Sequence, residues 1–152
     1  MLTVSTSRIE SKFRELEARR AKGLVVYLTA GDPTLEATAG LLAAVERGGA
    51  DLIELGVPFS DPLADGPVIQ RASERALRAG ATLRRILESL PRWREGVHAP
   101  VILFSYYDQD EIKRVLTTVP MSGSLMGWFA KIAAGGALIR ITEQMLALSG
   151  PC

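Results

Sequence analysis

Residues 51–57 read DLIELGV, a short and mostly apolar run that is typical of a buried β-strand. Similar runs precede and follow it, LVVYLT at 24–29 and VILFSYY at 101–107. The segments between these strands repeat apolar residues at helical spacing, so helices are predicted there. They cover residues 35–47, 67–79 and 83–94. Continuously apolar strands that alternate with helices indicate a parallel sheet with helical crossovers.

The two ends of the chain extend this pattern differently. Ser7 and Glu10 form a capping-box pattern, which predicts a helix over 8–21. After the third strand the alternation is lost. Residues 110–118 are predicted to form a short helix and residues 128–148 a longer, mostly apolar one, and no fourth strand is expected.

Composition excludes several classes of function. The 152 residues include 18 Lys and Arg against 17 Asp and Glu, which gives no electrostatic case for nucleic acid or an anionic membrane. The most apolar stretch, 115–139, is interrupted by Pro120 and by glycines, so no membrane span is expected. No signal peptide is recognised at the N-terminus. The lone Cys152 cannot form an intrachain disulfide, which favours a reducing cytoplasm.

Glu54 is the most unusual residue of the predicted sheet, because it interrupts an apolar strand. Parallel α/β folds place their sites at the carboxyl ends of strands. Alternation puts Glu54 on one face of its strand with Leu52 and Gly56. Burial there would raise the pKa of the carboxyl group toward the range that suits proton transfer. A structural glutamate that bonds to backbone N–H groups or to an arginine explains the pattern equally well.

Further candidates follow the predicted strands. Asp61 and Asp65 lie in the loop after Glu54, where an aspartate is usually a turn former or a helix cap. Together, carboxylates in different environments can divide acid and base work. Tyr27 and Tyr106, near strand ends, either line a pocket for an aromatic ligand or fill the core. No Cys/His spacing typical of a metal site and no glycine-rich phosphate loop is present.

Residues 52–67, LIELGVPFSDPLADGP, continue as VIQRA and resemble the signature of the tryptophan synthase alpha chain family. The stretches YLTAGDP at 27–33 and FSYY at 104–107 match the same family in order and spacing. The resemblance covers about residues 8–107. We therefore interpret 1–107 as the N-terminal part of such a protein and 108–152 as an unmatched, mostly apolar tail.

The resemblance implies a (β/α)8 TIM barrel, here an incomplete barrel with about three clear β/α units. It also implies a lyase of tryptophan biosynthesis that splits indole-3-glycerol phosphate into indole and glyceraldehyde 3-phosphate without a cofactor. Members of this family work with a tryptophan synthase beta chain, as two alpha and two beta chains. The metal-free, cofactor-free chemistry would then rest on side chains alone.

Roles for individual residues are also implied by the resemblance. Glu54 would be the general acid/base that protonates the indole carbon, and Asp65 would hold the proton of the indole nitrogen. Tyr27 and Tyr106 would line the indole pocket. The residues that would contact the beta chain are Pro58 and Asp61.

The chain departs from the family after its third strand. Asp108-Gln109 stands where the family has Asn-Pro, and the later units with the phosphate-binding loops are not matched. A frameshift or an internal deletion after residue 107 would explain this loss. At most weak turnover is therefore expected of this truncated chain. The alternatives are a non-catalytic partner or modulator of the beta chain, and a degraded chain without activity.

Overall fold

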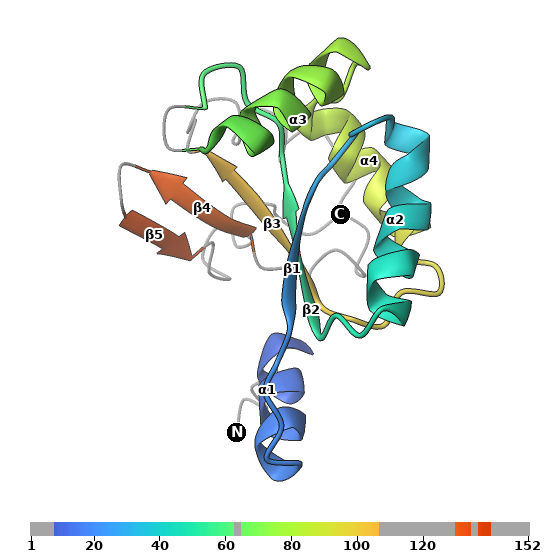
Figure 1. Ribbon diagram of the computed structural model, residues 1–152, viewed down its shortest axis with the longest axis vertical. Helices are drawn as coiled ribbons and strands as arrows, with labels where there is room; N and C mark the ends of the chain where they lie inside the picture. The colour runs from blue at the N-terminus through green and yellow to red at the C-terminus, as the bar shows by residue number, and fades with distance from the viewer. Residues whose placement is uncertain (1–7, 63–64, 107–129, 135–136, 141–152) are drawn as a thin grey trace, which may run out of the picture.

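The computed structural model describes residues 8–62, 65–106, 130–134 and 137–140, and these form a five-stranded sheet with helices (Figure 1). The strand order is β1-β2-β3-β4-β5. Strands β1 to β4 run parallel, and β5 is antiparallel to β4. The strands are β1 (Val25–Thr29), β2 (Leu52–Gly56), β3 (Val101–Tyr106), β4 (Ala130–Ala134) and β5 (Ala137–Arg140).

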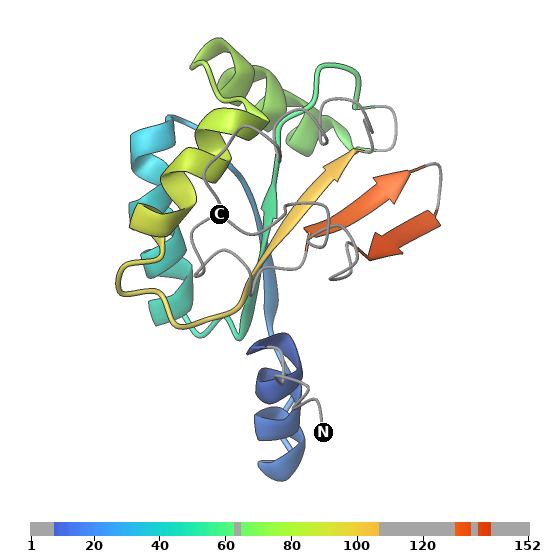
Figure 2. The same cartoon turned by 180° about the vertical axis from the view of Figure 1, so that it is seen from behind.

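Three of the four described helices cover one face of the sheet, as the two opposite views in Figures 1 and 2 show. The helices are α1 (Arg8–Ala18), α2 (Leu35–Arg47), α3 (Pro67–Arg78) and α4 (Leu83–Trp93). The threonines before α2 and α4, Thr34 and Thr82, accept hydrogen bonds from backbone N–H groups of the first turn. Pro67 is the first residue of α3, where its missing N–H costs nothing. Helix α1 lies apart, at the amino ends of the strands.

The hydrophobic core lies between the sheet and helices α2 to α4. Ile53 and Leu55 of β2 are fully buried there. Alternate residues of a strand point to opposite faces, so Glu54 and Gly56 lie on the face away from the helices. The other fully buried side chains of this core include Leu42, Ile86 and Leu90. The predicted division of β2 into two faces is thus confirmed.

The bounds of the first three strands and of α2 to α4 agree with the predicted ones to within a residue. Helix α1 ends at Ala18 instead of 21 and is followed by a turn in which the N–H of Ala21 donates to the carbonyl of Leu16. The segment 110–118 and Ser7 lie outside the described residues. None of the helices in the described part of the chain is long and apolar enough to cross a membrane.

The predicted helix over 128–148 is wrong, because its described residues form β4 and β5. Strand β4 pairs with the outer edge of β3, whose backbone groups otherwise have no partner on that side. Strand β5 then pairs with β4, with Ala134 opposite Ala137. The two residues between them in the sequence are Gly135-Gly136, a pair that favours a tight hairpin over a helix. Part of the segment 108–152 therefore extends the same sheet.

Candidate active site

The register of the first three strands brings Tyr27, Glu54 and Phe104 onto one face of the sheet. Tyr27 is paired with Glu54, and Gly56 lies between Thr29 on one side and Phe104 on the other. This face points away from helices α2 to α4. Glu54 is partly buried there, at the position where strand alternation predicts it.

The ring of Tyr27 lies directly over the backbone of Gly56. A Cβ atom added to Gly56 would be 1.9 Å from Oη of Tyr27 and 2.5 Å from its Cζ. Only a residue without a side chain permits this approach. The Tyr27 ring also meets Phe104 edge to face, with centroids 6.3 Å apart and planes at 84°. Gly56 and Phe104 thus determine where the phenol group lies.

The electrostatic surroundings of Tyr27 connect it to both candidate carboxylates. Burial raises the pKa of the Tyr27 hydroxyl, and the nearby Asp65, Tyr106 and Glu54 raise it further. A hydrogen bond with the side chain of Thr29 opposes this shift. Tyr27 therefore keeps its proton at neutral pH. These electrostatic effects link Tyr27 to both predicted acids and to Tyr106.

Asp65 lies at the end of the loop that joins β2 to α3. Its backbone N–H donates to the carbonyl of Pro62 at 3.1 Å. Its own carbonyl accepts a hydrogen bond from Nε2 of Gln70 at 2.8 Å. Helix α3 begins two residues after Asp65, so the acid is positioned by the helix that follows it.

The first part of the same loop is held by β3. The N–H of Val57 donates to the carbonyl of Phe104 at 2.8 Å. The ring of Phe59 stacks on Tyr106, with centroids 5.0 Å apart and planes at 22°. Tyr106 is the last residue of β3, so this aromatic pair lies at the carboxyl end of that strand.

Asp32, in the loop after β1, is bound to helix α3. Nε and Nη2 of Arg75 donate to its two carboxylate oxygens at 2.8 and 2.7 Å. Gly31 has a φ of +87°, and a Cβ there would lie 2.6 Å from Cβ of Ala81. The stretch YLTAGDP thus joins the first strand to the helices beside the site.

The two residues that were predicted to contact a beta chain differ in exposure. Asp61 is exposed, whereas Pro58 is buried within this chain. Of the two, Asp61 alone offers a side chain to a partner in this conformation.

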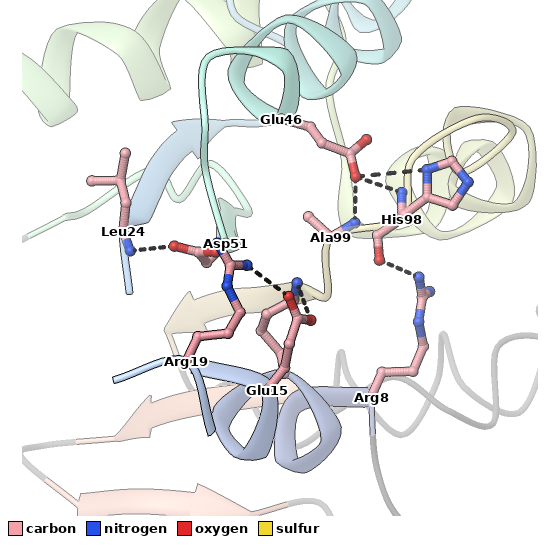
Figure 3. Close-up of polar contacts among 9 residues, drawn as sticks. Arg8, Glu15, Arg19, Leu24, Glu46, Asp51, His98 and Ala99 are labelled. Carbon is pink, nitrogen blue, oxygen red and sulfur yellow. Dashed lines mark hydrogen bonds and ion pairs between the residues drawn. The ribbon is translucent and has the colours of Figure 1, made fainter. Parts of the chain in front are cut away.

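His98 and Trp93 lie away from these residues. At the amino ends of the strands, Oε1 of Glu46 accepts hydrogen bonds from the N–H groups of His98 and Ala99 at 2.8 and 2.7 Å (Figure 3). The carbonyl of His98 accepts one from Arg8 of α1 at 2.6 Å. Trp93 is 2% exposed and packs in the core.

A sequence model of the tryptophan synthase alpha chain family matches residues 13–113. This chain belongs to that family. The tryptophan synthase alpha chain of Solibacter usitatus is 58% identical over 100 residues, which are 66% of this chain and 38% of that protein. The one from Burkholderia thailandensis is 56% identical over 101 residues, 66% of this chain and 37% of that protein. The match therefore spans less than two fifths of the length of these curated relatives.

Solved structures of the tryptophan synthase family support the same fold. Tryptophan synthase subunit alpha from Legionella pneumophila superimposes with a TM-score of 0.67 at 42% identity, covering 72% of this chain and 42% of that one. An aminoacrylate-bound tryptophan synthase from M. tuberculosis covers 94% of this chain and 57% of that chain, with a TM-score of 0.66 and 29% identity. The predicted fold class, an incomplete TIM barrel, is confirmed.

Four residues beside the predicted site of this tryptophan synthase alpha family member were not singled out from the sequence. Phe104 shares a strand face with Tyr106, so strand alternation was a signal that could have found it. For the other three no local pattern exists, because each acts through a contact with a residue from another element. They are Gly56, Phe59 and Gln70.

Proposed function

We propose that this chain carries the catalytic carboxylates of a lyase that splits indole-3-glycerol phosphate into indole and glyceraldehyde 3-phosphate. The observation that carries this proposal is that Tyr27 of β1 is paired with Glu54 of β2 on one face of the sheet, where burial and the charges of Asp65 and Glu54 raise the pKa of the Tyr27 hydroxyl. Membership in the tryptophan synthase alpha family supplies the reaction.

Glu54 is proposed as the general acid/base. It gives a proton to the indole carbon that bears the glycerol phosphate chain, which prepares the carbon–carbon bond for cleavage. The Glu54 carboxylate then takes the proton of the adjacent hydroxyl of that chain as the aldehyde forms, and the electrons of the broken carbon–carbon bond return to the indole ring. The net reaction neither oxidises nor reduces the substrate, so proton transfer by side chains is sufficient.

Asp65 is proposed to accept a hydrogen bond from the indole N–H. Protonation of the ring carbon places positive charge on the ring nitrogen, and a carboxylate beside that nitrogen stabilises the charge as it develops. One carboxylate that binds the ring nitrogen and a second that exchanges protons is the division of work expected of paired carboxylates.

The aromatic residues of the site suit a flat aromatic substrate. Tyr27 and Phe104 meet edge to face, and Phe59 stacks on Tyr106. We propose that Tyr27 and Tyr106 line the indole pocket, where ring faces and edges provide contact area. The neutral hydroxyl of Tyr27 adds a polar atom that senses the charges of both acids and carries no charge of its own.

A tryptophan synthase beta chain is the proposed partner. We propose that the loop between β2 and α3 contacts it through the exposed Asp61, with the buried Pro58 shaping the loop behind it. A reducing cytoplasm is the proposed compartment.

The experiment measures indole released from indole-3-glycerol phosphate by a large excess of the chain, with and without a beta chain. We expect slow release that is lost in Glu54→Gln and strongly reduced in Asp65→Asn. Glu88→Gln on the exposed side of α4 is the matched control and leaves release unchanged. Equal rates for the parent and Glu54→Gln would contradict the proposal. If the beta chain is bound under those conditions, the result supports a non-catalytic partner instead.

A further inference from the structure

Helix α3 begins without a capping side chain, since its N-cap residue is Gly66. A side chain from the next turn instead reaches back to the preceding loop. Nε2 of Gln70 lies 2.8 Å from the carbonyl oxygen of Asp65 and 3.4 Å from that of Pro62. Gln70 thus bonds the loop in front of its own helix.

The two carbonyl groups that Gln70 contacts belong to one turn. The N–H of Asp65 donates to the same Pro62 carbonyl at 3.1 Å, which closes the turn. The primary amide of a glutamine has two N–H groups, so one can serve each carbonyl. A single side chain therefore holds both ends of the turn that carries Asp65.

The earlier part of the loop depends on other contacts. Val57 is bonded to the backbone of β3, and Phe59 stacks on Tyr106. These contacts lie before Pro62 in the sequence. The part of the loop near Asp65 is held by the side chain of Gln70 and by the hydrogen bond from the Asp65 N–H to the Pro62 carbonyl.

We infer that Gln70 is a positioning residue that holds the turn that carries the Asp65 carboxylate. The inference deepens the proposed function and rests on the role given there to Asp65. Gln70 touches the backbone of Asp65, so it acts on the reaction only through that residue. Displacement of a reacting group by about 1 Å is enough to lower a rate by about two orders of magnitude.

Tyr27 offers a measure of the position of Asp65 that needs no substrate. Because the Asp65 carboxylate contributes to the raised pKa of the Tyr27 hydroxyl, that pKa falls when the charge moves away or is removed. Tyrosine labelled with ¹³C at Cζ reports ionisation of each ring by NMR, and Tyr27→Phe identifies the signal. The full chain is titrated in four forms: parent, Asp65→Asn, Gln70→Met and the double variant.

Gln70→Met keeps the length of the side chain and removes both donors. We expect it to lower the pKa of Tyr27 by at least half as much as Asp65→Asn does. In the double variant the pKa should fall no further than in Asp65→Asn alone. Arg71→Gln, at the adjacent exposed position of α3, is the control and should leave the Tyr27 signal unchanged.

Three results would overturn the inference. One is a parent-like Tyr27 titration in Gln70→Met. Another is a change in the Tyr27 pKa on Gln70→Met that is as large in the Asp65→Asn background as in the parent, since Gln70 would then act on Tyr27 by a route other than Asp65. The third is an unchanged Tyr27 pKa in Asp65→Asn itself.

Gln70→Glu provides a second variant if Gln70→Met does not fold. It also lacks the donors, and its added negative charge opposes the predicted fall, so a lower Tyr27 pKa in this variant is strong support. If Gln70→Glu is the sole folded variant, it is also combined with Asp65→Asn, and an equal shift of the Tyr27 pKa in both backgrounds would overturn the inference. These titrations are independent of turnover. If the Gln70 variants do not change the Tyr27 pKa as expected, the role of Gln70 is rejected. If they do change it but the parent chain releases no indole, the proposed function is rejected.

Discussion

Gly56→Ala should destabilise the protein through the ring of Tyr27. The new Cβ would lie 1.9 Å from Oη, 2.5 Å from Cζ and 2.9 Å from Cε2 of that ring, and ordinary contact begins at 3.4 Å. The phenol group therefore has to withdraw by about 1.5 Å, against Phe104 and the neighbouring strands. Overpacking of this kind costs about 1–3 kcal/mol.

A smaller effect acts in the opposite direction. Replacing glycine by alanine at a position with ordinary backbone angles stabilises a protein by about 0.5 kcal/mol, because the unfolded chain loses conformational freedom. We therefore expect a net loss of about 1–2 kcal/mol in the free energy of unfolding. Gly40→Ala in α2 is the control, because nothing lies within 4 Å of its added Cβ. Better helix propensity should make that variant more stable by up to about 1 kcal/mol.

The assay is urea unfolding followed by circular dichroism, repeated in a Tyr27→Leu background. Leucine at position 27 does not reach across Gly56. In the Tyr27→Leu background, Gly56→Ala should therefore be neutral or slightly stabilising. The coupling between the two positions should be about 1–3 kcal/mol. In Tyr27→Phe the rescue should be partial, since Cζ and Cε2 still collide. A Gly56→Ala variant within about 0.5 kcal/mol of the parent, or equal effects in both backgrounds, would refute the reasoning.

Two further predictions concern the pair of hydrogen bonds that Glu46 accepts and the titration of Tyr27. Glu46→Ala removes the acceptor of two backbone N–H groups. It should lower the free energy of unfolding, measured with urea, by about 2–3 kcal/mol. Glu46→Gln keeps an acceptor oxygen and should lower the free energy of unfolding by less than half as much. Equal losses in the two variants would contradict this account. The pKa of the Tyr27 hydroxyl is raised in the folded state above the ordinary value of 10.0. The contribution of this shift to stability is therefore complete below pH 10 and is lost as the pH rises through the folded pKa. Urea midpoints measured from pH 8 upward should fall less steeply above pH 10 in Tyr27→Phe than in the parent, and parallel curves would count against it.

Local sequence patterns were sufficient to predict the strands and helices that bury one regular face. The apolar runs at 24–29, 51–57 and 101–107 and the helical spacing between them predicted β1 to β3 and α2 to α4, because burial on one side imposes a period on the sequence. The same alternation placed Glu54 on the face away from the helices. The helix predicted over 128–148 was wrong for the residues that the structure describes there, 130–134 and 137–140, since apolar content alone does not separate a helix from strands.

The candidate site was predicted only in part, for a comparable reason. Glu54, Asp65, Tyr27 and Tyr106 stood out because acids and tyrosines at strand ends are visible in one dimension. Their assembly around Tyr27 was not visible, because it depends on the register of β1 against β2 and on the path of the loop before α3.

The sequence by itself determined the strand and helix units, the face on which Glu54 lies and the family to which the chain belongs. The tertiary structure alone decided that Tyr27 rests on Gly56, that Gln70 bonds the turn of Asp65, and that β4 and β5 extend the sheet. The physical reason is the range of the interactions. Periodicity and capping act between neighbours in the chain, whereas these contacts join different elements, and a register or a loop path fixes them only after the chain has folded.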